Sequence, residues 1–274
     1  MINDTAIGLE HLCVLGMPPV EFVNLAADLG CPWIATGFSP VVDDVMGFGT
    51  WSLRDNPGLR REMLAAMRDR GVSISMGEGF WITPGSDIRD QKASLALWRE
   101  MDVSRIGTLS FDPDLNRSHD QFAYLAEMAA EQDMDVVLEF VPGLAIADLP
   151  GALRARQQVN RDNFSILIDT LHLHRSGSSA ADLATLPPGT IGYLQVCDAP
   201  LEPVIEEYAV EATYERLPPG EGQLPLLDIL NAIPAEVFVG LELPMRSRVS
   251  DQAAFGELLQ PCVDATRELL LQRS

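Results

Sequence analysis

Four polar side chains stand near the ends of otherwise apolar stretches in the second half of the chain. They are Glu139, Asp169, Gln195 and Glu242. An unpaired acid is costly to bury, so four such positions in succession indicate one shared site. Three crowded carboxylates repel one another, and a divalent cation is the simplest compensation. Because all four offer oxygen ligands, the expected cofactor is one Mn²⁺ or Mg²⁺ ion, with Co²⁺ as a further candidate.

The stretch from Phe164 to His172 changes most abruptly from apolar to chemically active residues. Its apolar run fits a strand buried on both faces, and Asp169 falls at the carboxyl end of that strand. In strict alternation Asp169 and His172 would point to opposite faces, so they meet at one site only where the backbone turns after Asp169. The alternative is that Asp169 caps a turn and that His172 is an ordinary loop histidine.

The other three proposed ligands also have structural alternatives. Glu139 and Glu242 could pair with nearby arginines, and Gln195 could satisfy backbone groups. The sequence alone leaves these alternatives open, and the metal hypothesis rests on the four positions taken together.

Four further residues are candidates for contacts with a substrate. His11 either faces the site or is a hydrogen-bonded core residue, and Glu78 either binds substrate or belongs to a turn. Trp81 is expected on a loop, where it would line the pocket, pack in the core or contact another subunit. Arg246 could attract a substrate carboxylate or phosphate against the acidic background, or pair with surface acids.

Apolar runs alternate with amphipathic segments along the whole chain, and this order predicts the fold. Eight strand-helix repeats without a break in composition favour one domain, residues 1–274, folded as a (β/α)₈ TIM barrel. A doubly wound open sheet is the competing fold, but no G-x-G-x-x-G follows the first strand. The expected strands are residues 7–15, 33–36, 72–76, 105–111, 135–141, 164–169, 190–196 and 236–243. The expected helices are about 18–29, 56–70, 87–101, 118–132, 148–159, 179–186, 225–231 and 250–272, with long insertions at 37–51 and 200–224.

The charge balance limits the partners. The chain has 19 basic and 40 acidic residues, a formal net charge of −21, so long-range electrostatics repel nucleic acid and anionic membranes. The expected partner is a small-molecule substrate, and homo-oligomers are common among such barrels although no interface can be identified from the sequence. The start of the chain lacks the pattern of a signal peptide and no long apolar run occurs, so a cytoplasmic protein is expected. The cysteines are scattered without paired spacing, which favours buried free thiols.

Several separated motifs resemble one enzyme family. They are Val-Leu-Glu139-Phe, Asp169-Thr-Leu-His172, Gln195-Val-Cys-Asp198-Ala, Arg216-Leu-Pro-Pro-Gly220-Glu221-Gly222 and Leu-Glu242-Leu-Pro. This order resembles the xylose isomerase-like TIM barrels, the sugar phosphate isomerase/epimerase group, over nearly the whole chain. The resemblance implies that Glu139, Asp169, the residue at 195 and Glu242 bind a divalent metal. It also implies that His172 contacts substrate or moves protons and that Arg216 anchors a substrate oxygen.

One residue departs from the usual pattern of this group. Most of its isomerases and epimerases carry histidine where this chain has Gln195, and a glutamine there resembles the 3-dehydroshikimate dehydratases. Glutamine can coordinate a metal but cannot exchange a proton. The sequence therefore predicts a metal-dependent isomerase or epimerase of a small polyhydroxylated carbonyl compound, with a dehydratase as the alternative.

Both candidate reactions begin with removal of a proton next to a carbonyl group and formation of an enolate. In an isomerase or epimerase, Glu139 and Glu242 are expected to act as base and acid on opposite faces of the substrate. In a dehydratase, which expels a β-hydroxyl group, His172 is the natural base or acid. A binding barrel without catalysis is a third hypothesis. An endonuclease IV-like repair enzyme is disfavoured, because its zinc site is rich in histidine and this chain has four histidines and a strongly negative charge.

Overall fold

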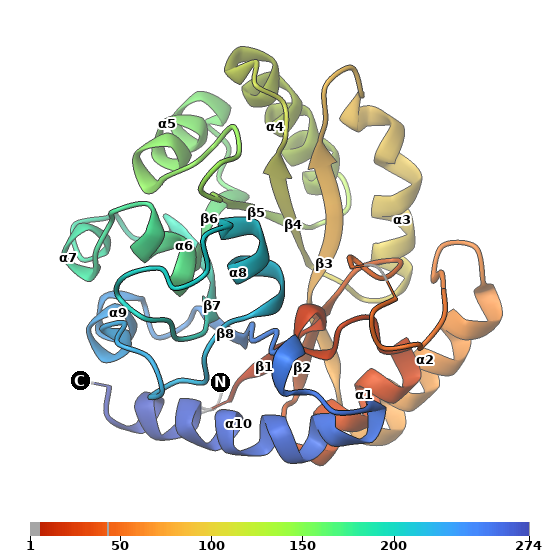
Figure 1. Ribbon diagram of the computed structural model, residues 1–274. Coiled ribbons are helices and arrows are strands. Elements are labelled where there is room, and N and C mark those ends of the chain that lie inside the picture. Colours follow the sequence, from red (N-terminus) through yellow and green to blue (C-terminus); the bar gives the residue numbers. More distant parts are fainter. Residues whose placement is uncertain (1–5, 43, 274) are drawn as a thin grey trace.

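The computed structural model describes residues 6–42 and 44–273. Within them eight parallel strands close into a barrel in simple chain order, and helices surround the barrel (Figure 1). This confirms the predicted (β/α)₈ fold. The strands are β1 Gly8–Glu10, β2 Trp33–Thr36, β3 Ser73–Ile82, β4 Arg105–Ser110, β5 Asp135–Glu139, β6 Phe164–Asp169, β7 Ile191–Val196 and β8 Phe238–Leu241.

The helices follow the strands as a (β/α)₈ barrel requires. The α-helices are α1 Pro19–Asp28, α2 Pro57–Arg70, α3 Lys92–Glu100, α4 Leu115–Ala130, α5 Leu149–Val159, α6 Thr170–Arg175, α7 Ala180–Leu183, α8 Tyr208–Tyr214, α9 Leu226–Ala232 and α10 Phe255–Leu271. Four short 3₁₀ helices complete the described elements: η1 His11–Val14, η2 Ile88–Gln91, η3 Arg246–Arg248 and η4 Gln252–Ala254. No helix in residues 6–42 and 44–273 is both long and apolar enough to cross a lipid bilayer.

Local sequence signals explain where several helices begin and end. The side chain of Asn56 accepts a hydrogen bond from the Leu59 amide at 3.0 Å, and Pro57 occupies the first turn of α2. Gly71 ends that helix with φ of 69°, a left-handed conformation that glycine adopts without strain. Asp114 and Asp148 cap α4 and α5 in the same way as Asn56. Asn56 and Asp148 lie where the sequence predicts helix boundaries, whereas α4 begins at Leu115, ahead of the predicted start at about residue 118.

Two strands differ most from the prediction. The first ends at Glu10, because the chain turns into η1 and does not continue extended to residue 15. The third extends to Ile82, so Trp81 lies on a strand and not on a loop. Two helices, α6 and α8, are absent from the prediction, and both lie close to the pocket described below.

The barrel interior is built in layers along the strands. Ala35, Met76, Val137, Leu167 and Tyr193 point inward and form a separate apolar cluster inside the barrel. Inward-facing residues recur at every second position of a strand. The next inward residues toward the carboxyl ends carry carboxylate or amide groups. These are Glu78 after Met76, Glu139 after Val137, Asp169 after Leu167 and Gln195 after Tyr193. The fold therefore places an apolar floor directly beneath a polar layer.

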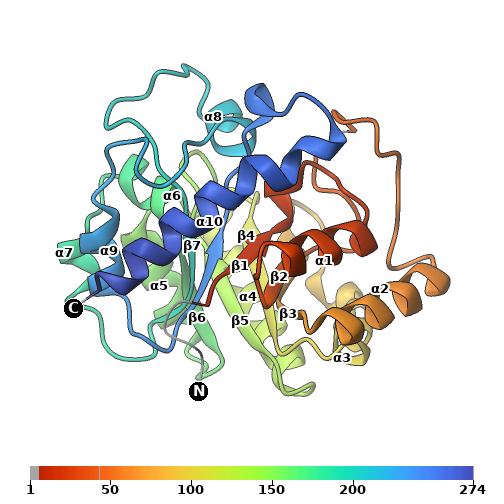
Figure 2. The same cartoon turned by 90° about the horizontal axis from the view of Figure 1, so that it is seen from below.

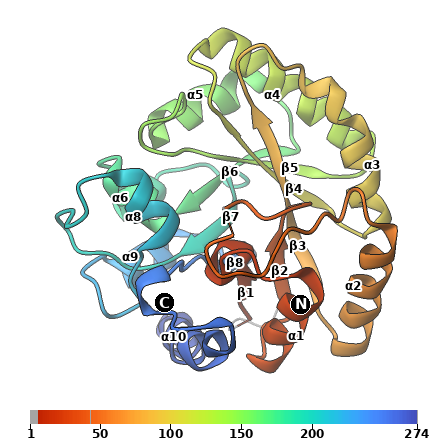
Figure 3. The same cartoon turned by 45° about the vertical axis from the view of Figure 1, so that its right-hand side comes forward.

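Segments after the strands close over this polar layer. Helix α8 lies above one end of the barrel (Figure 2), and α6 lies beside it (Figure 3). The carboxylate of Asp198 accepts hydrogen bonds from the amides of Ala199, Gly220 and Leu224 at 2.8, 2.9 and 3.0 Å. Residue 222 is a glycine because a Cβ there would lie 2.2 Å from Asp198 Oδ1. The two motifs around Asp198 and Gly222 thus hold the long insertion against the barrel.

Candidate active site

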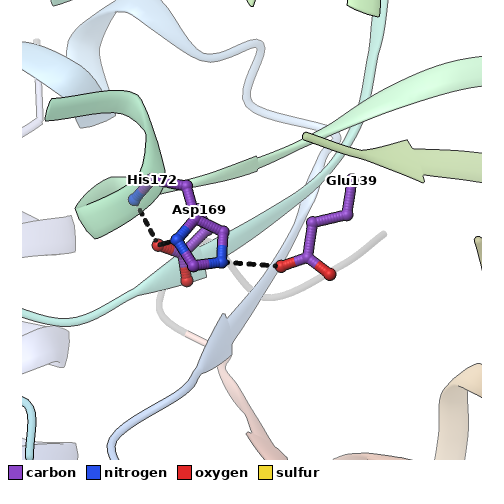
Figure 4. A group of neighbouring side chains, drawn as sticks. All are labelled: Glu139, Asp169 and His172. Atoms are coloured by element: carbon purple, nitrogen blue, oxygen red, sulfur yellow. Dashed lines mark hydrogen bonds and ion pairs between the residues drawn. The ribbon is translucent and has the colours of Figure 1, made fainter. Parts of the chain in front are cut away.

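Asp169 and His172 meet because the chain turns into a helix directly after β6. Asp169 keeps an extended backbone with φ of −102° and ψ of 132°, and its Oδ1 accepts a hydrogen bond from the His172 amide at 2.9 Å. It is therefore the N-cap of α6, and the turn predicted after Asp169 is present. The imidazole of His172 lies between the carboxylates of Asp169 and Glu139 (Figure 4). Nε2 is 3.3 Å from Glu139 Oε1, and Nδ1 is 3.7 Å from Asp169 Oδ1.

Tyr208 of α8 also contacts His172 and was not predicted from the sequence. Its hydroxyl group forms a hydrogen bond with His172 Nδ1, and the two rings meet edge to face with centroids 5.8 Å apart. Burial raises the pKa of Tyr208, so its hydroxyl group stays protonated at neutral pH. Arg175 of α6 binds both oxygens of Glu211 of α8 at 2.7 and 2.9 Å, which holds the two helices together. His172 thus has a fixed ring orientation, with Nε2 directed at Glu139.

Arg216 bridges two of the four proposed metal ligands. Its Nη1 lies 2.5 Å from Asp169 Oδ2 and 2.9 Å from Glu242 Oε2, and its side chain is 2% exposed. Burial alone would raise the pKa of Asp169, but Arg216 and His172 outweigh it and lower that pKa to about 2. Burial raises the pKa of Glu242, and the nearby acids raise it further. Arg216 lowers it, but by less, so the pKa of Glu242 is raised overall. Arg216 therefore holds Asp169 in its charged form.

Glu10, at the end of β1, is a further buried acid in this layer that the sequence analysis missed. Its Oε1 accepts a hydrogen bond from the Tyr193 hydroxyl at 2.8 Å, and its Oε2 accepts one from Gln195 Nε2 at 3.3 Å. Burial and the neighbouring Glu78 raise the pKa of Glu10. Burial, with a contribution from Glu139, also raises the pKa of Glu78 to about 7. In the structure Glu10 stands at a strand end like the other acids, whereas the strand predicted over residues 7–15 placed it mid-strand.

The ligand-type side chains form two neighbouring groups. Ligand atoms of Glu139, Asp169 and His172 lie within 4.8 Å of one another, and so do those of Glu10, Glu78 and Glu242. Gln195 joins the second group, because its Nε2 donates to Glu242 Oε1 at 3.3 Å as well as to Glu10. The proposed ligand set is therefore divided between the two groups, which Arg216 connects through Asp169 and Glu242.

Two observations fit a divalent cation at this layer. The first is that Gln195 Oε1, on a side chain that is 2% exposed, has no hydrogen-bond partner in the part of the chain that the structure describes. An amide oxygen of this kind is a ligand that hard cations accept. The second is charge, because five carboxyl groups face one guanidinium group. A cation would relieve the repulsion among them.

The polar layer opens into a pocket of about 650 Å³. Among the predicted residues, Glu78, Trp81, Glu139, His172, Gln195, Arg216 and Glu242 line it. Asp169 is 1% exposed and lies behind His172 and Arg216.

Two candidates for substrate contact do not line this pocket. His11 is buried, with its Nε2 2.9 Å from the Met17 carbonyl oxygen, and its ring meets the rings of Phe22 and Trp51 edge to face. Arg246 is exposed on η3, with its guanidinium group 5.4 Å from the centre of the Tyr214 ring. Both side chains lie outside the pocket for the same reason. The chain turns into a 3₁₀ helix beyond β1 and beyond β8, and this turn directs His11 and Arg246 away from the pocket.

Comparison with known proteins agrees with the barrel fold. The family model of the xylose isomerase-like TIM barrel matches residues 23–262, whereas no curated protein sequence matches the chain. Among solved structures, the IolI protein with a bound zinc atom has a TM-score of 0.74 at 16% identity, covering 97% of both chains. D-psicose 3-epimerase from Clostridium cellulolyticum H10 has a TM-score of 0.73 at 17% identity, covering 97% of this chain and 99% of its own. A probable 3-DHS dehydratase, AsbF, from Bacillus anthracis has a TM-score of 0.74 at 17% identity, covering 98% and 100%.

At these identities the solved structures show a shared fold, and the family model shows the relationship. The match extends over most of the chain and includes every strand from β2 to β8. The chain therefore belongs to the xylose isomerase-like TIM barrel family.

Proposed function

We propose that this protein is a metal-dependent isomerase or epimerase that removes a proton next to the carbonyl group of a small polyhydroxylated compound. The observation that carries the proposal is the arrangement at the pocket floor. Glu139, Glu242 and His172, which can move protons, line one pocket together with Gln195 and Arg216. The similar fold of an enzyme named as a D-psicose 3-epimerase supports this reaction class.

We propose that Glu139, Asp169, Gln195 and Glu242 hold the metal ion. The set consists of oxygen ligands, which favours Mn²⁺ or Mg²⁺, with Co²⁺ as a further candidate. When bound, the ion would supply positive charge that polarises the substrate carbonyl group. The similarity in fold to a protein with a bound zinc atom supports a metal but does not select its identity.

The chain's own residues would position the substrate and move protons. Glu139 has a side chain that is 19% exposed, so it can reach a bound molecule, and its Oε1 contacts His172 Nε2. Glu242 lines the same pocket, and we expect it to act together with Glu139 as the second acid or base on the substrate. Arg216 lies between Asp169 and Glu242 and lines the pocket, where it would orient a substrate oxygen.

A dehydratase is the second candidate, because of Gln195 and His172. With glutamine at position 195, His172 is the single imidazole among the residues lining the pocket. Its Nε2 directed at Glu139 and its Nδ1 held by Tyr208 suit a general base or acid that assists loss of a β-hydroxyl group. The fold of a probable 3-DHS dehydratase is similarly close.

One experiment separates these candidates. The purified protein is incubated in D₂O with Mn²⁺ and a panel of ketoses, or with 3-dehydroshikimate. Deuterium uptake at carbon without loss of water supports the isomerase or epimerase, whereas protocatechuate absorbance supports the dehydratase. Replacing His172 by Gln should abolish dehydration, and His119→Gln on α4, outside the pocket lining, is the matched control. A bound metal without deuterium uptake from any substrate would instead indicate a binding barrel.

We also propose that the partner is a small molecule and neither nucleic acid nor a membrane. The formal charge of −21 supports this, because a phosphate backbone or an anionic lipid surface would be repelled. A filter-binding assay with duplex DNA at low salt checks it, with no retention expected.

A further inference from the structure

The pocket has an acidic floor and an apolar outer wall. Strand β3 continues from Glu78 to Ile82, so Trp81 lies beyond the acids and pairs with Leu109 near the end of β4. Trp81 is 41% exposed and Phe111 is 44% exposed, and their rings meet edge to face with centroids 6.1 Å apart. The half-buried side chains of Leu109 and Leu144 extend this wall. Large aromatic side chains exposed side by side at a pocket mouth indicate a surface that a ligand covers.

The pocket has no surplus positive charge for an anionic substrate. Of the residues that line it, Arg216 and His172 are the basic ones, and Arg216 is already paired with two carboxylates. A divalent ion and Arg216 together would offset three of the five negative charges that the floor carries when fully ionised. Beyond the lining, Arg246 lies over Tyr214 and Arg248 binds Glu221 at 2.7 Å. A phosphate or carboxylate group would therefore enter the pocket without a cation to receive it.

The size of the pocket also indicates a ligand that reaches beyond the acidic floor. A volume of about 650 Å³ falls in the range of sites that hold drug-sized ligands, and the acids take up only its floor. A small polyol bound at the acids would leave the outer wall uncovered. The wall is apolar and aromatic, so the remainder of the ligand should be apolar and preferably flat.

Building on the proposed function, we propose that the substrate is an uncharged polyhydroxylated carbonyl compound that carries an aromatic substituent. The hydroxyl and carbonyl groups lie at the acidic floor, and the aromatic ring contacts Trp81 and Phe111. This assignment weighs against sugar phosphates and against 3-dehydroshikimate itself, whose carboxylate has no partner here. Elimination chemistry on an uncharged substrate remains compatible with it.

Binding measurements test this assignment without requiring turnover. The probes are methyl β-D-glucoside, phenyl β-D-glucoside and glucose 6-phosphate, titrated calorimetrically into the Mn²⁺-loaded and the metal-free protein. We expect the phenyl glucoside to bind about tenfold more tightly than the methyl glucoside, because its ring covers apolar wall. We expect glucose 6-phosphate to bind more weakly than either. Trp81→Ala should remove the preference for the phenyl glucoside, whereas Tyr124→Ala, an exposed aromatic residue on α4 outside the pocket lining, should preserve it.

Four results would overturn the proposal. They are equal affinity for the two glucosides, tighter binding of the phosphate, a phenyl preference that survives Trp81→Ala, and a subunit contact at this wall. Sedimentation of the wild type and of Trp81→Ala detects the last, since loss of an oligomer in the variant would show that another subunit covers the wall. The proposed function fails separately, when no carbonyl compound takes up deuterium even though the phenyl preference is present.

Discussion

Replacing Arg216 by Met would reveal what the guanidinium group contributes to the site. Its Nη1 lies 2.5 Å from Asp169 and 2.9 Å from Glu242, and all three side chains are largely buried. Removing one partner from a buried ion pair costs about 3–5 kcal/mol of folding free energy, because the remaining charge is left uncompensated. We therefore expect the metal-free variant to be less stable than the metal-free wild type by about 3 kcal/mol at pH 7.

The pH dependence of this loss follows from Asp169. Its pKa is about 2 in the folded protein and 3.8 in the unfolded chain, so its charged form contributes about 2.5 kcal/mol at neutral pH. Because the folded pKa is the lower one, this contribution is complete well above pH 3.8 and is lost as the pH falls toward 2. The difference in stability between wild type and Arg216→Met should therefore narrow by about 1 kcal/mol between pH 5 and pH 3.

Whereas the stability of the metal-free protein should fall in Arg216→Met, its affinity for a divalent metal ion should rise. Without the guanidinium group, Asp169 and Glu242 have no competing cation, so a divalent ion should bind at least about tenfold more tightly, a change of about 1.4 kcal/mol. Urea denaturation in EDTA measures the stability, and calorimetric titration with Mn²⁺ measures the affinity. Arg117→Met is the control, since Arg117 pairs with the buried Asp112 at 3.2 Å outside the pocket lining and should leave Mn²⁺ affinity unchanged. Unchanged metal-free stability at pH 7, or weaker Mn²⁺ binding by Arg216→Met, would refute this reasoning.

Three further variants test other parts of the structure. Burial lowers the pKa of His11 to about 4, so wild type should lose about 2.5 kcal/mol between pH 7 and pH 4.5 relative to His11→Phe, as thermal melts at both pH values would show. Asp169→Asn keeps an oxygen for the N-cap but removes a charge, so metal content after dialysis, measured by mass spectrometry, should fall at least about tenfold. Gly222→Ala places a Cβ 2.2 Å from Asp198 Oδ1 and should lower the urea midpoint by an amount equivalent to about 2 kcal/mol.

The order of strands and helices could be predicted because each βα unit repeats one local pattern. The two helices that were missed have a different origin. Helix α6 is short and begins directly after Asp169, the last residue of β6. Helix α8 lies inside a long insertion and has no strong apolar stripe. Both depend on contacts between distant residues, such as the pairing of Arg175 with Glu211. Sequence periodicity carries no signal for contacts of this kind.

The candidate site could be predicted only in part for a related reason. The acids at strand ends were found because they interrupt apolar runs, and Glu10 was missed because the expected strand continued to residue 15. With the strand ending at Glu10, the same two-residue alternation that places Gln195 above Tyr193 also places Glu10 in the polar layer. His11 was a reasonable candidate by residue type, but its direction depends on the turn into η1.

Asp169 shows that a capping role and a role in the site need not exclude each other. Its Oδ1 accepts the His172 amide and so begins α6, while its Oδ2 faces Arg216. The turn that brings His172 toward Asp169 is thus the helix that Asp169 itself caps. Because the two roles use different oxygens, a side chain with one acceptor oxygen can keep the helix while losing the charge. The position of His172 and the charge of the site are therefore separable properties of a single residue.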